Sequence, residues 1–442
     1  MRAVDQEPRT LRDEPETVRP TFTPADSIRW HRSVSTEDFL QRLESGPGKQ
    51  HPTQRSDRKC VFSDGSEHAV PAFVNLFWSR KQRAGSSLHR LTYRGSFSPR
   101  LSRYFIEGLT RPDEAVYDPF MTRGTTPIEA ALLGRIPLGN DADPLSRMLV
   151  EPRLQPQFVG NAMARLHAWC EDSWCEMSPE LLKLFHPETL SDLCMVRNYL
   201  LGAKSGGFMD EVDRWNRMLV LACLAGPRSG HLIGPTLHPN TPLLPTRWHR
   251  PIAPRDCQLP KKELFGTLSR TSSALTRDWD SQVRPLLDRA AARGKFSTCQ
   301  AERTPHIPQG SVALIVTRPP GLKPYNYERD NGIRCWFVGI DPHSVRLITH
   351  RQLEAWMMEM ATVFLELYRV LKPGGHLVVE IGGLRPRKVR WDEVILECAL
   401  VAGFQEVAIL TNTPHAMAPA QSGRSRMVEF EEAIVVKKRD MP

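Results

Sequence analysis

The stretch AVYDPFMTRGTTPIEAALLGRIPLGNDADPLS, residues 115–146, decides the fold. It predicts a short strand at 115–117, a turn rich in Gly and Thr, a helix at about 127–133, and a second strand that ends at Asp141. Strand, helix and strand in this order form one βαβ unit. Units of this kind build parallel sheets whose faces are covered by helices.

The same alternation returns near the carboxyl terminus. Two continuous apolar segments are typical of fully buried strands, SVALIVT (311–317) and HLVVEIG (376–382). Amphipathic or apolar helices are predicted at 350–371 and 391–404, and EEAIVVKK (431–438) predicts a last strand. We therefore expect an α/β protein with a Rossmann-like, doubly wound, mainly parallel sheet.

The composition changes along the chain and suggests four segments. Residues 1–70 are rich in charged residues and Pro and are expected to be a partly disordered leader, with one short helix at 35–45. Residues 71–154 and 301–442 carry the α/β pattern. Residues 155–300 contain helical patterns and a basic, Pro-rich stretch, which predicts a helical insertion.

The totals exclude several classes of protein. The 442 residues carry a net charge of +9, which favours a polyanionic partner, although a soluble basic protein without such a partner is an equal alternative. The nine cysteines include no C-x-x-C pair, so neither a disulfide framework nor a metal site is expected. The polar start and the lack of a long apolar run predict a cytoplasmic protein with no membrane segment. No oligomeric state is predicted.

Unusual residues stand at three predicted strand ends, where ligands of doubly wound sheets bind. They are Asp118 with the following turn to Gly124, then Asp141, and then the segment 317–321. The turn lacks the Lys of a phosphate loop and the three glycines of a dinucleotide fingerprint. A ligand with an α-amino acid end and a ribose fits better, because Asp118 suits an amino group and Asp141 suits ribose hydroxyls. These are the needs of S-adenosylmethionine, and a purely structural turn with a capping Asp is the alternative.

Three spaced motifs resemble those of amino-group DNA methyltransferases, the cytosine-N4 and adenine-N6 family. DPFMTRGTTPIEA with the later Asp is similar to the family's cofactor motif D-P-F-x-G-S-G-T-T-x-x-E-A, and TRPPGLKPYNYERDNGIRCWFVG (317–339) is similar to its catalytic segment, usually T-S-P-P-Y/F. ELYRVLKPGGHLVVEIG resembles a later turn and strand. The cofactor residues that the resemblance implies are Asp118, Pro119, Phe120, Thr122, Gly124, Thr125, Thr126 and Asp141. The catalytic residues that it implies are Thr317, Arg318, Pro319, Pro320, Gly321 and Tyr327.

The resemblance implies a class I methyltransferase fold that binds S-adenosylmethionine and double-stranded DNA with the target base flipped out. The methyl group would pass directly to an exocyclic amino nitrogen, with cytosine N4 favoured over adenine N6 because Thr317 precedes the prolines. The insertion at 155–300 would recognise the target, with the run Trp248-His249-Arg250 as one contact.

The sequence departs from the family pattern at the catalytic turn. Arg318 stands where an acceptor side chain is expected and has only donors, and Gly321 replaces the aromatic residue that stacks on the base. Together these changes correspond to a rate lower by about three to five orders of magnitude. Thr122-Arg123 replaces Gly-Ser in the cofactor turn. A catalytically silent homologue that binds DNA is therefore the alternative hypothesis, and methylation of RNA or protein is a third.

Overall fold

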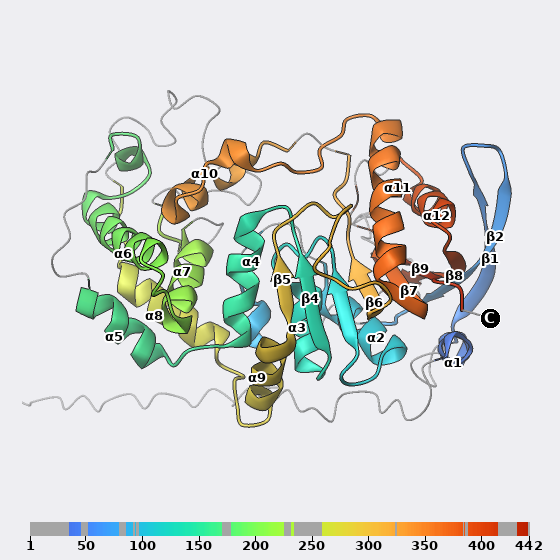
Figure 1. Cartoon of the computed structure of the whole chain (residues 1–442), viewed down its shortest axis with the longest axis horizontal. Coiled ribbons are helices and arrows are strands. Elements are labelled where there is room, and N and C mark those ends of the chain that lie inside the picture. The colour runs from blue at the N-terminus through green and yellow to red at the C-terminus, as the bar shows by residue number, and fades with distance from the viewer. Residues whose placement is uncertain are drawn as a thin grey trace, which may run out of the picture.

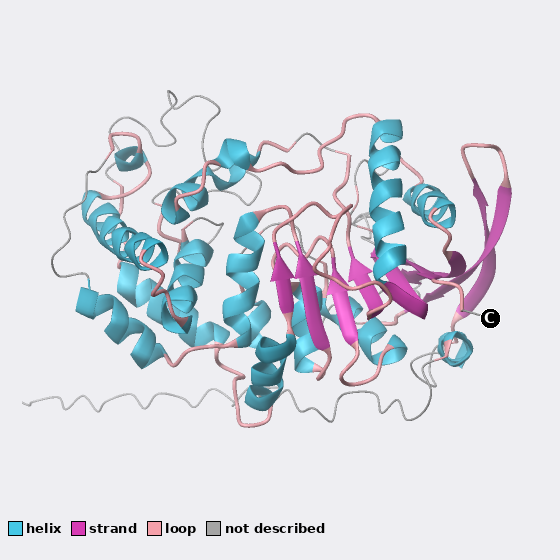
Figure 2. Cartoon of the chain, in the orientation of Figure 1, coloured by secondary structure: helices cyan, strands magenta, loops and turns pink. Residues whose placement is uncertain are grey.

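The computed structural model describes residues 35–45, 52–78, 85–91, 93, 97–169, 178–224, 231–233, 259–322, 325–382, 384, 388–413 and 431–440. Within these residues the strands form one nine-stranded sheet in the order β1-β2-β8-β9-β7-β6-β3-β4-β5 (Figures 1 and 2). The strands are β1 (Gln54–Val61), β2 (Glu67–Asn75), β3 (Ala115–Asp118), β4 (Ile136–Asn140), β5 (Lys295–Ser297), β6 (Val312–Thr317), β7 (Leu371–Glu380), β8 (Gln405–Asn412) and β9 (Glu431–Lys437).

The order of the strands is that of a doubly wound sheet. From β3 the chain moves outward through β4 to β5, and from β6 it moves in the opposite direction to β7, with parallel pairing throughout this half. Strand β9 runs antiparallel between β7 and β8. The order therefore reverses between β3 and β6, where ligands of such sheets bind. The predicted α/β, mainly parallel fold is confirmed.

The helices lie on both faces of the sheet or in a separate bundle (Figure 1). They are α1 (Thr36–Ser45), α2 (Pro99–Leu109), α3 (Thr125–Leu132), α4 (Pro144–Val150), α5 (Val159–Trp169), α6 (Pro187–Ser205), α7 (Glu211–Cys223), α8 (Leu264–Leu275), α9 (Val283–Arg293), α10 (Tyr327–Val338), α11 (Leu353–Val370) and α12 (Trp391–Val401). Short 3-10 turns are η3 (Ser87–His89), η4 (Glu151–Leu154), η5 (Leu181–Lys183) and η6 (Pro342–Ser344).

Alternating side chains of the central strands supply two cores. Tyr117 of β3 and Ile315 of β6 face α11 and α12, whereas Val116 and Leu314, one residue earlier, face α1, α2 and α3. Every residue of β6 is buried. This double burial explains why β6 is a continuous apolar run and not an alternating one.

The helices α5 to α8 form the bundle at the left of Figure 1, and they share a core with α4 and α10. Helix α10 begins at Tyr327, six residues after Gly321, and it packs into this core through Ile333, Phe337 and Val338. The chain therefore leaves the sheet at β6, crosses to the bundle, and returns to the sheet with α11. The run Trp248-His249-Arg250 lies outside the described residues.

Three features differ from the segments expected from the sequence. The predicted leader, residues 1–70, contains the confirmed helix α1 but also β1 and the start of β2, a hairpin that extends the sheet beyond β8. The predicted insertion, residues 155–300, includes β5, which instead pairs with β4 at the edge of the sheet. The turn expected within ELYRVLKPGGHLVVEIG, at its KPGG residues 372–375, is part of β7, with Gly374 at a positive φ of 71°.

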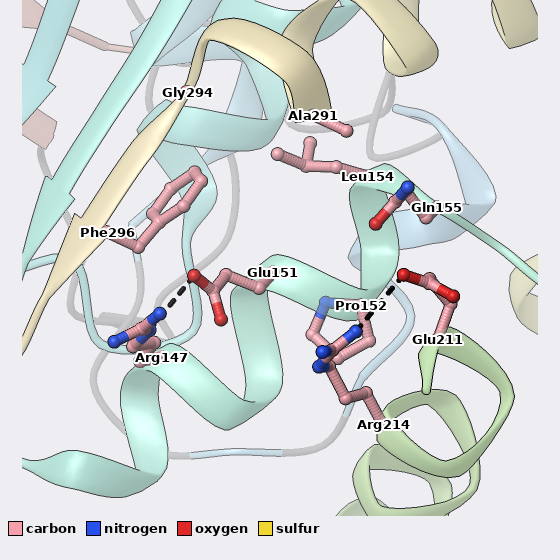
Figure 3. A pocket seen from close by; sticks show the side chains of 10 residues that line it. All are labelled: Arg147, Glu151, Pro152, Leu154, Gln155, Glu211, Arg214, Ala291, Gly294 and Phe296. Atoms are coloured by element: carbon pink, nitrogen blue, oxygen red, sulfur yellow. Dashed lines mark hydrogen bonds and ion pairs between the residues drawn. The ribbon is translucent and has the colours of Figure 1, made fainter. Parts of the chain in front are cut away.

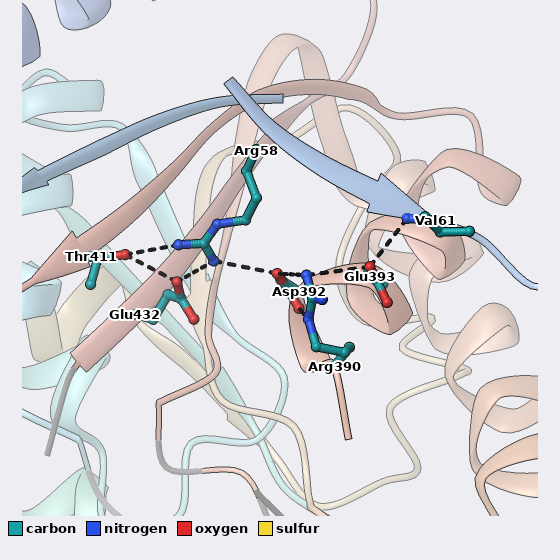
Figure 4. A network of polar contacts seen from close by, with 7 residues as sticks. All are labelled: Arg58, Val61, Arg390, Asp392, Glu393, Thr411 and Glu432. Atoms are coloured by element: carbon teal, nitrogen blue, oxygen red, sulfur yellow. Dashed lines mark hydrogen bonds and ion pairs between the residues drawn. The ribbon is translucent and has the colours of Figure 1, made fainter. Parts of the chain in front are cut away.

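Ion pairs attach the hairpin to the rest of the sheet (Figure 4). Arg58 of β1 pairs with Glu432 of β9 at 2.5 Å and with Asp392 of α12 at 3.3 Å. Glu393 accepts a hydrogen bond from the Val61 amide at 3.2 Å. These contacts hold β1 on the sheet although most of its side chains are exposed. Because an exposed strand can be polar, its sequence shows no apolar pattern that would predict a strand.

Neither a membrane-spanning helix nor a metal-binding cluster is found among the described residues. None of their helices combines the length and the apolar character that a bilayer crossing requires. No cluster of three or more His, Cys, Asp or Glu side chains in that part of the chain is arranged to hold a metal ion.

Candidate active site at the carboxyl ends of the parallel strands

The carboxylate of Asp118 lies at the end of β3, at the point where the strand order reverses. Its Oδ1 accepts hydrogen bonds from the Thr317 hydroxyl at 2.6 Å and from the Phe120 amide at 3.1 Å. Its Oδ2 is buried and has no hydrogen-bond partner among the described residues. Burial raises the pKa of Asp118 to about 7, although the bond from Thr317 acts in the opposite direction. The structure thus holds a buried carboxyl group with one oxygen fixed and the other unsatisfied.

The turn that follows Asp118 has an unusual backbone. Thr122 adopts a positive φ of 47° and Gly124 a positive φ of 76°. A Cβ at Gly124 would lie 2.5 Å from Val150 of α4, so only glycine fits there. Thr122 holds the left-handed conformation with a hydroxyl bond to the Phe120 carbonyl at 3.2 Å. Thr122, which replaces a glycine of the family pattern, therefore adopts the backbone conformation of that glycine at the cost of strain.

The first two residues of α3 differ in their contacts. The Thr126 hydroxyl donates to the Val316 carbonyl of β6 at 2.9 Å, so it ties the helix to the sheet. The Thr125 hydroxyl is buried without a partner in the described structure. Gly124 caps the helix and has no side chain to do so. Of these two predicted cofactor residues, Thr125 keeps an unpaired hydroxyl and Thr126 ties α3 to β6.

Asp141 follows β4 and contacts the turn that follows Asp118. Its two carboxylate oxygens accept from the amides of Thr122 at 2.7 Å and of Asp143 at 2.9 Å. Burial, and next the charge of Asp143, raises the pKa of Asp141. At the end of β4, Asn140 contacts the Pro119 carbonyl at 3.5 Å through its amide nitrogen. The ends of β3 and β4 are thus joined through this turn, and Asp141 keeps a lone pair on each oxygen for a further donor.

The double-proline corner at the end of β6 is anchored from α11. The indole nitrogen of Trp356 donates to the Pro320 carbonyl at 2.7 Å. No hydrogen bond to the Pro319 carbonyl is found among the described residues. Both prolines restrict the backbone and lack an N–H. Trp356 therefore holds the Pro320 carbonyl in a rigid corner, and the Pro319 carbonyl has no hydrogen-bond partner in the described part of the chain.

Arg318 makes an ion pair at this corner. Its Nε donates to the carboxylate of Glu380, a buried residue at the end of β7. Its guanidinium lies 5.5 Å from the ring centre of Phe97. This pair was not expected from the sequence, although β6 and β7 are neighbours and their ends must meet. The position that the resemblance assigns to an acceptor is therefore held by a paired cation.

Tyr327 is placed in the core of the bundle. Its hydroxyl donates to Asp143 at 2.5 Å, and the hydroxyl of Tyr93 donates to the other oxygen of Asp143 at 2.6 Å. Burial raises the pKa of Tyr327 far above its ordinary value. A ring held in this way connects α10 to the start of α4, which the sequence did not indicate. The structure gives Tyr327 an anchoring contact, and its predicted catalytic role has no support in these contacts.

Two arginines border the cofactor turn, of which Arg153 is buried and Arg123 is half-buried. Arg153 is fully buried and donates to the carbonyls of Leu149 at 2.8 Å, Leu88 at 2.9 Å and Arg123. Arg123 donates to the Leu91 carbonyl at 3.2 Å, while its Nε is buried without a partner in the described part of the chain. Burial, and next the charge of Arg123, lowers the pKa of Arg153 to about 9. In the sequence Arg123 stands out only as a replacement in the cofactor motif, and no local pattern indicates Arg153.

A separate hollow of about 230 Å³ lies where the bundle meets the sheet (Figure 3). It is lined by Arg147, Glu151, Pro152, Leu154, Gln155, Glu211, Arg214, Ala291, Gly294 and Phe296. Its charged side chains are already paired, with Arg147 and Glu151 at 2.9 Å and Arg214 and Glu211 at 3.3 Å. None of the predicted site residues lines this hollow.

The chain matches no protein-family model and no curated protein sequence. Among solved structures, it is similar to a TehB-like SAM-dependent methyltransferase from Corynebacterium glutamicum, with 8% identity over 77% of this chain and 87% of the other, and a TM-score of 0.28. An rRNA methyltransferase from Streptomyces viridochromogenes gives 12% identity over 81% and 93% of the two chains and a TM-score of 0.31. A candidate DNA modification methylase from Thermus thermophilus gives 22% identity, covers 30% of this chain and 47% of that one, and has a TM-score of 0.18. The fold assignment rests on the strand order and not on these low scores.

Proposed function

We propose that the protein is an S-adenosylmethionine-dependent methyltransferase that acts on an exocyclic amino group of a DNA base, with cytosine N4 favoured over adenine N6. The observation that carries this proposal is the unsatisfied Oδ2 of Asp118. It lies beside Thr317, at the reversal of strand order, and Thr317 leads directly into the double-proline corner. An amino group that donates to Asp118 would therefore sit next to the corner.

The residues at the strand ends fit this cofactor. A buried carboxylate with one oxygen left without a hydrogen bond, as in Asp118, is unfavourable, and a bound ammonium group would relieve that cost. Asp141 offers acceptors to ribose hydroxyls, and Thr125 offers a free hydroxyl. When bound, the cofactor supplies a methyl group on a positively charged sulfur. Asp118 would hold its amino group, and the turn around Gly124 would bring the backbone close to it.

The double-proline corner would then hold the target nitrogen. An exocyclic amine is a weak nucleophile because its lone pair is delocalised into the ring, and hydrogen-bond acceptors at its N–H groups make the nitrogen more reactive. The Pro319 carbonyl is one such acceptor, fixed in place by the bond from Trp356 to the next carbonyl. Arg318 offers no second acceptor, because its guanidinium is bound to Glu380 and can only donate. We therefore expect slow transfer.

The proposal is tested with S-adenosylmethionine that carries a tritiated methyl group. Purified protein is incubated with equal amounts of double-stranded DNA, RNA and unrelated protein in the same tube, and the three fractions are separated and counted. We expect label in DNA alone. Label in RNA or protein, with DNA empty, would refute the proposed substrate.

A second function, a catalytically silent homologue that binds DNA, is favoured by the ion pair of Arg318 with Glu380. The variant Arg318→Ser with Gly321→Tyr restores the acceptor and the ring of the family pattern, and it tests this alternative. If the protein is silent, the wild type transfers no label and the double variant does. If the wild type already labels DNA, the silent function is excluded. Each single substitution serves as a control, since one change alone restores only half of the pattern.

A further inference from the structure

A second hollow, with a volume of about 260 Å³, lies at the helical bundle, between the residues that follow η3, the end of α7 and one side of α8. None of the residues predicted to hold the cofactor or to act in catalysis lines it. Small-molecule sites begin at about 300 Å³, so the hollow suits a compact ligand and is small for a cofactor with both a nucleoside and an amino acid. It is therefore a candidate site separate from the strand ends.

The charged side chains of this hollow are positive. Arg90 and Arg270 line it, and no Asp or Glu is among its lining residues in the described part of the chain. Both arginines are exposed, and neither makes an ion pair within the described residues. Arg270 donates to the Thr267 hydroxyl at 3.0 Å, a contact that leaves its charge unbalanced. Two guanidinium groups without an acidic partner favour an anion as the ligand.

The floor of the hollow is apolar. It is formed by Leu91, Ala222, Cys223 and Leu275, each at most 4% exposed. Burial raises the pKa of the Cys223 thiol to about 11, so at neutral pH the group stays protonated and is not a nucleophile. Aliphatic side chains and a neutral sulfur pack well against a flat ring. The floor therefore favours a ligand that carries a ring as well as an anionic group.

Arg270 connects the exposed arginines with the buried floor. Its charge acts on the Cys223 thiol, where it opposes part of the effect of burial on the pKa. His231 lines the same hollow and is 7% exposed, and an imidazole can donate a hydrogen bond in either of its charge states. The Leu232 amide holds this segment in place by donating to the Cys223 carbonyl at 2.9 Å. The donors for an anion and the floor for a ring therefore belong to one site.

We propose that this hollow binds a single nucleotide, with its base against the buried floor and its phosphate bound by Arg90 and Arg270. A guanidinium group matches a phosphate in charge and in the geometry of its donors. A free mononucleotide and a nucleic-acid strand carry the same phosphate, and the experiment distinguishes these two sources. The inference does not depend on the proposed function, because neither the turn after Asp118 nor the double-proline corner takes part.

Binding is measured by calorimetry with uridine monophosphate, uridine and a short single strand of thymidine nucleotides. None of these bases carries an exocyclic amino group, so none is a substrate of the proposed methyl transfer. The variants Arg90→Met and Arg270→Met remove one guanidinium each, and Ala274→Phe fills the hollow from α8. Arg293→Met is the matched control, because Arg293 is an exposed arginine of α9 that is ion-paired with Asp113 and does not line the hollow.

The wild type is expected to bind uridine monophosphate about 100-fold more tightly than uridine, since only the monophosphate reaches both arginines. Arg90→Met and Arg270→Met should each weaken binding of the monophosphate about 10-fold and leave binding of uridine within about twofold. Ala274→Phe should weaken binding of both by about 10-fold or more, because its ring takes the place of the base. Arg293→Met should bind as the wild type does. If the thymidine strand alone binds, with the same dependence on these substitutions, the inference stands and the source of the nucleotide is a nucleic acid.

Four outcomes overturn the inference. If the wild type binds uridine as tightly as its monophosphate, the phosphate is not recognised. If Arg90→Met and Arg270→Met change binding no more than Arg293→Met does, the ligand binds elsewhere on the molecule. If binding is lost in the two arginine variants and unchanged in Ala274→Phe, the arginines form a basic surface and the hollow takes no ligand. If the wild type binds neither the monophosphate nor the strand, the hollow is not a nucleotide site.

Discussion

Replacement of Asp118 by Asn should make the protein without ligand more stable at alkaline pH. Burial raises the pKa of this carboxyl from its ordinary value of 3.8 to about 7. The folded state therefore holds the proton more tightly than the unfolded state, so the cost of ionising Asp118 is absent below about pH 4 and fully present above about pH 7. The difference corresponds to about 4 kcal/mol at about 1.4 kcal/mol per pKa unit.

The Asn side chain recovers only part of this energy. It keeps an acceptor for the Thr317 hydroxyl, which lies 2.6 Å from Oδ1. Its NH2 group, however, takes the place of the unpartnered Oδ2 and becomes a buried donor without an acceptor, which costs about 1–3 kcal/mol. We expect a net gain of about 1–3 kcal/mol in the free energy of unfolding at pH 8. The same NH2 group repels an ammonium group, so binding of S-adenosylhomocysteine should weaken by about 10- to 100-fold.

Urea denaturation of the ligand-free proteins between pH 5 and pH 8 measures the first effect, and calorimetric titration measures the second. Asp113→Asn is the matched control, because Asp113 is an exposed Asp just before β3 whose ion pair with Arg293 contributes at most about 1 kcal/mol. The reasoning is refuted if Asp118→Asn is less stable than the wild type at pH 8, if the difference does not grow with pH, or if ligand affinity is unchanged.

Three further substitutions test the frame of the site. Gly124→Ala combines a positive φ of 76° with a Cβ placed 2.5 Å from a valine of α4, so we expect a loss of about 1–3 kcal/mol in urea denaturation; an unchanged midpoint would contradict the close packing. Trp356→Phe removes the donor to the Pro320 carbonyl at 2.7 Å and should lower methyl transfer more than ligand affinity, whereas an equal loss of both would point to general unfolding. Tyr327→Phe removes a donor to the buried Asp143 and should cost about 1–3 kcal/mol of stability, with ligand affinity preserved; a loss of transfer at unchanged stability would instead restore a catalytic role for Tyr327.

The sequence predicted the parts of the fold in which burial and local pattern agree. Strands β3, β4 and β6 with helices α3 and α11 were found because each is a continuous apolar run or an amphipathic helix between clear turns. Strand β5 has three residues, and β1 is polar and exposed, so neither shows an apolar pattern. Helix α10 was not predicted. Its buried residues include the polar Asp330, Asn331 and Arg334, so its sequence does not show the separate apolar and polar faces of an amphipathic helix.

The residues of the candidate site that stand at strand ends could be predicted from the sequence. Asp118 and Thr317 end β3 and β6, Asp141 follows β4, and the structure brings Asp118 and Thr317 into hydrogen-bond contact. The pairing of Arg318 with Glu380 joins residues 62 positions apart, and no local pattern indicates which acid meets which base. Contacts of this kind depend on the register of neighbouring strands and on side-chain direction, which a single sequence does not specify.

The most direct test of the account is a crystal structure of the protein with S-adenosylhomocysteine. The account predicts that the amino group of the ligand lies within hydrogen-bond distance of Oδ2 of Asp118, that the ribose contacts Asp141, and that the sulfur faces the Pro319 carbonyl. A ligand bound in the hollow between α4 and α9, or one whose amino group lies away from Asp118, would contradict the account.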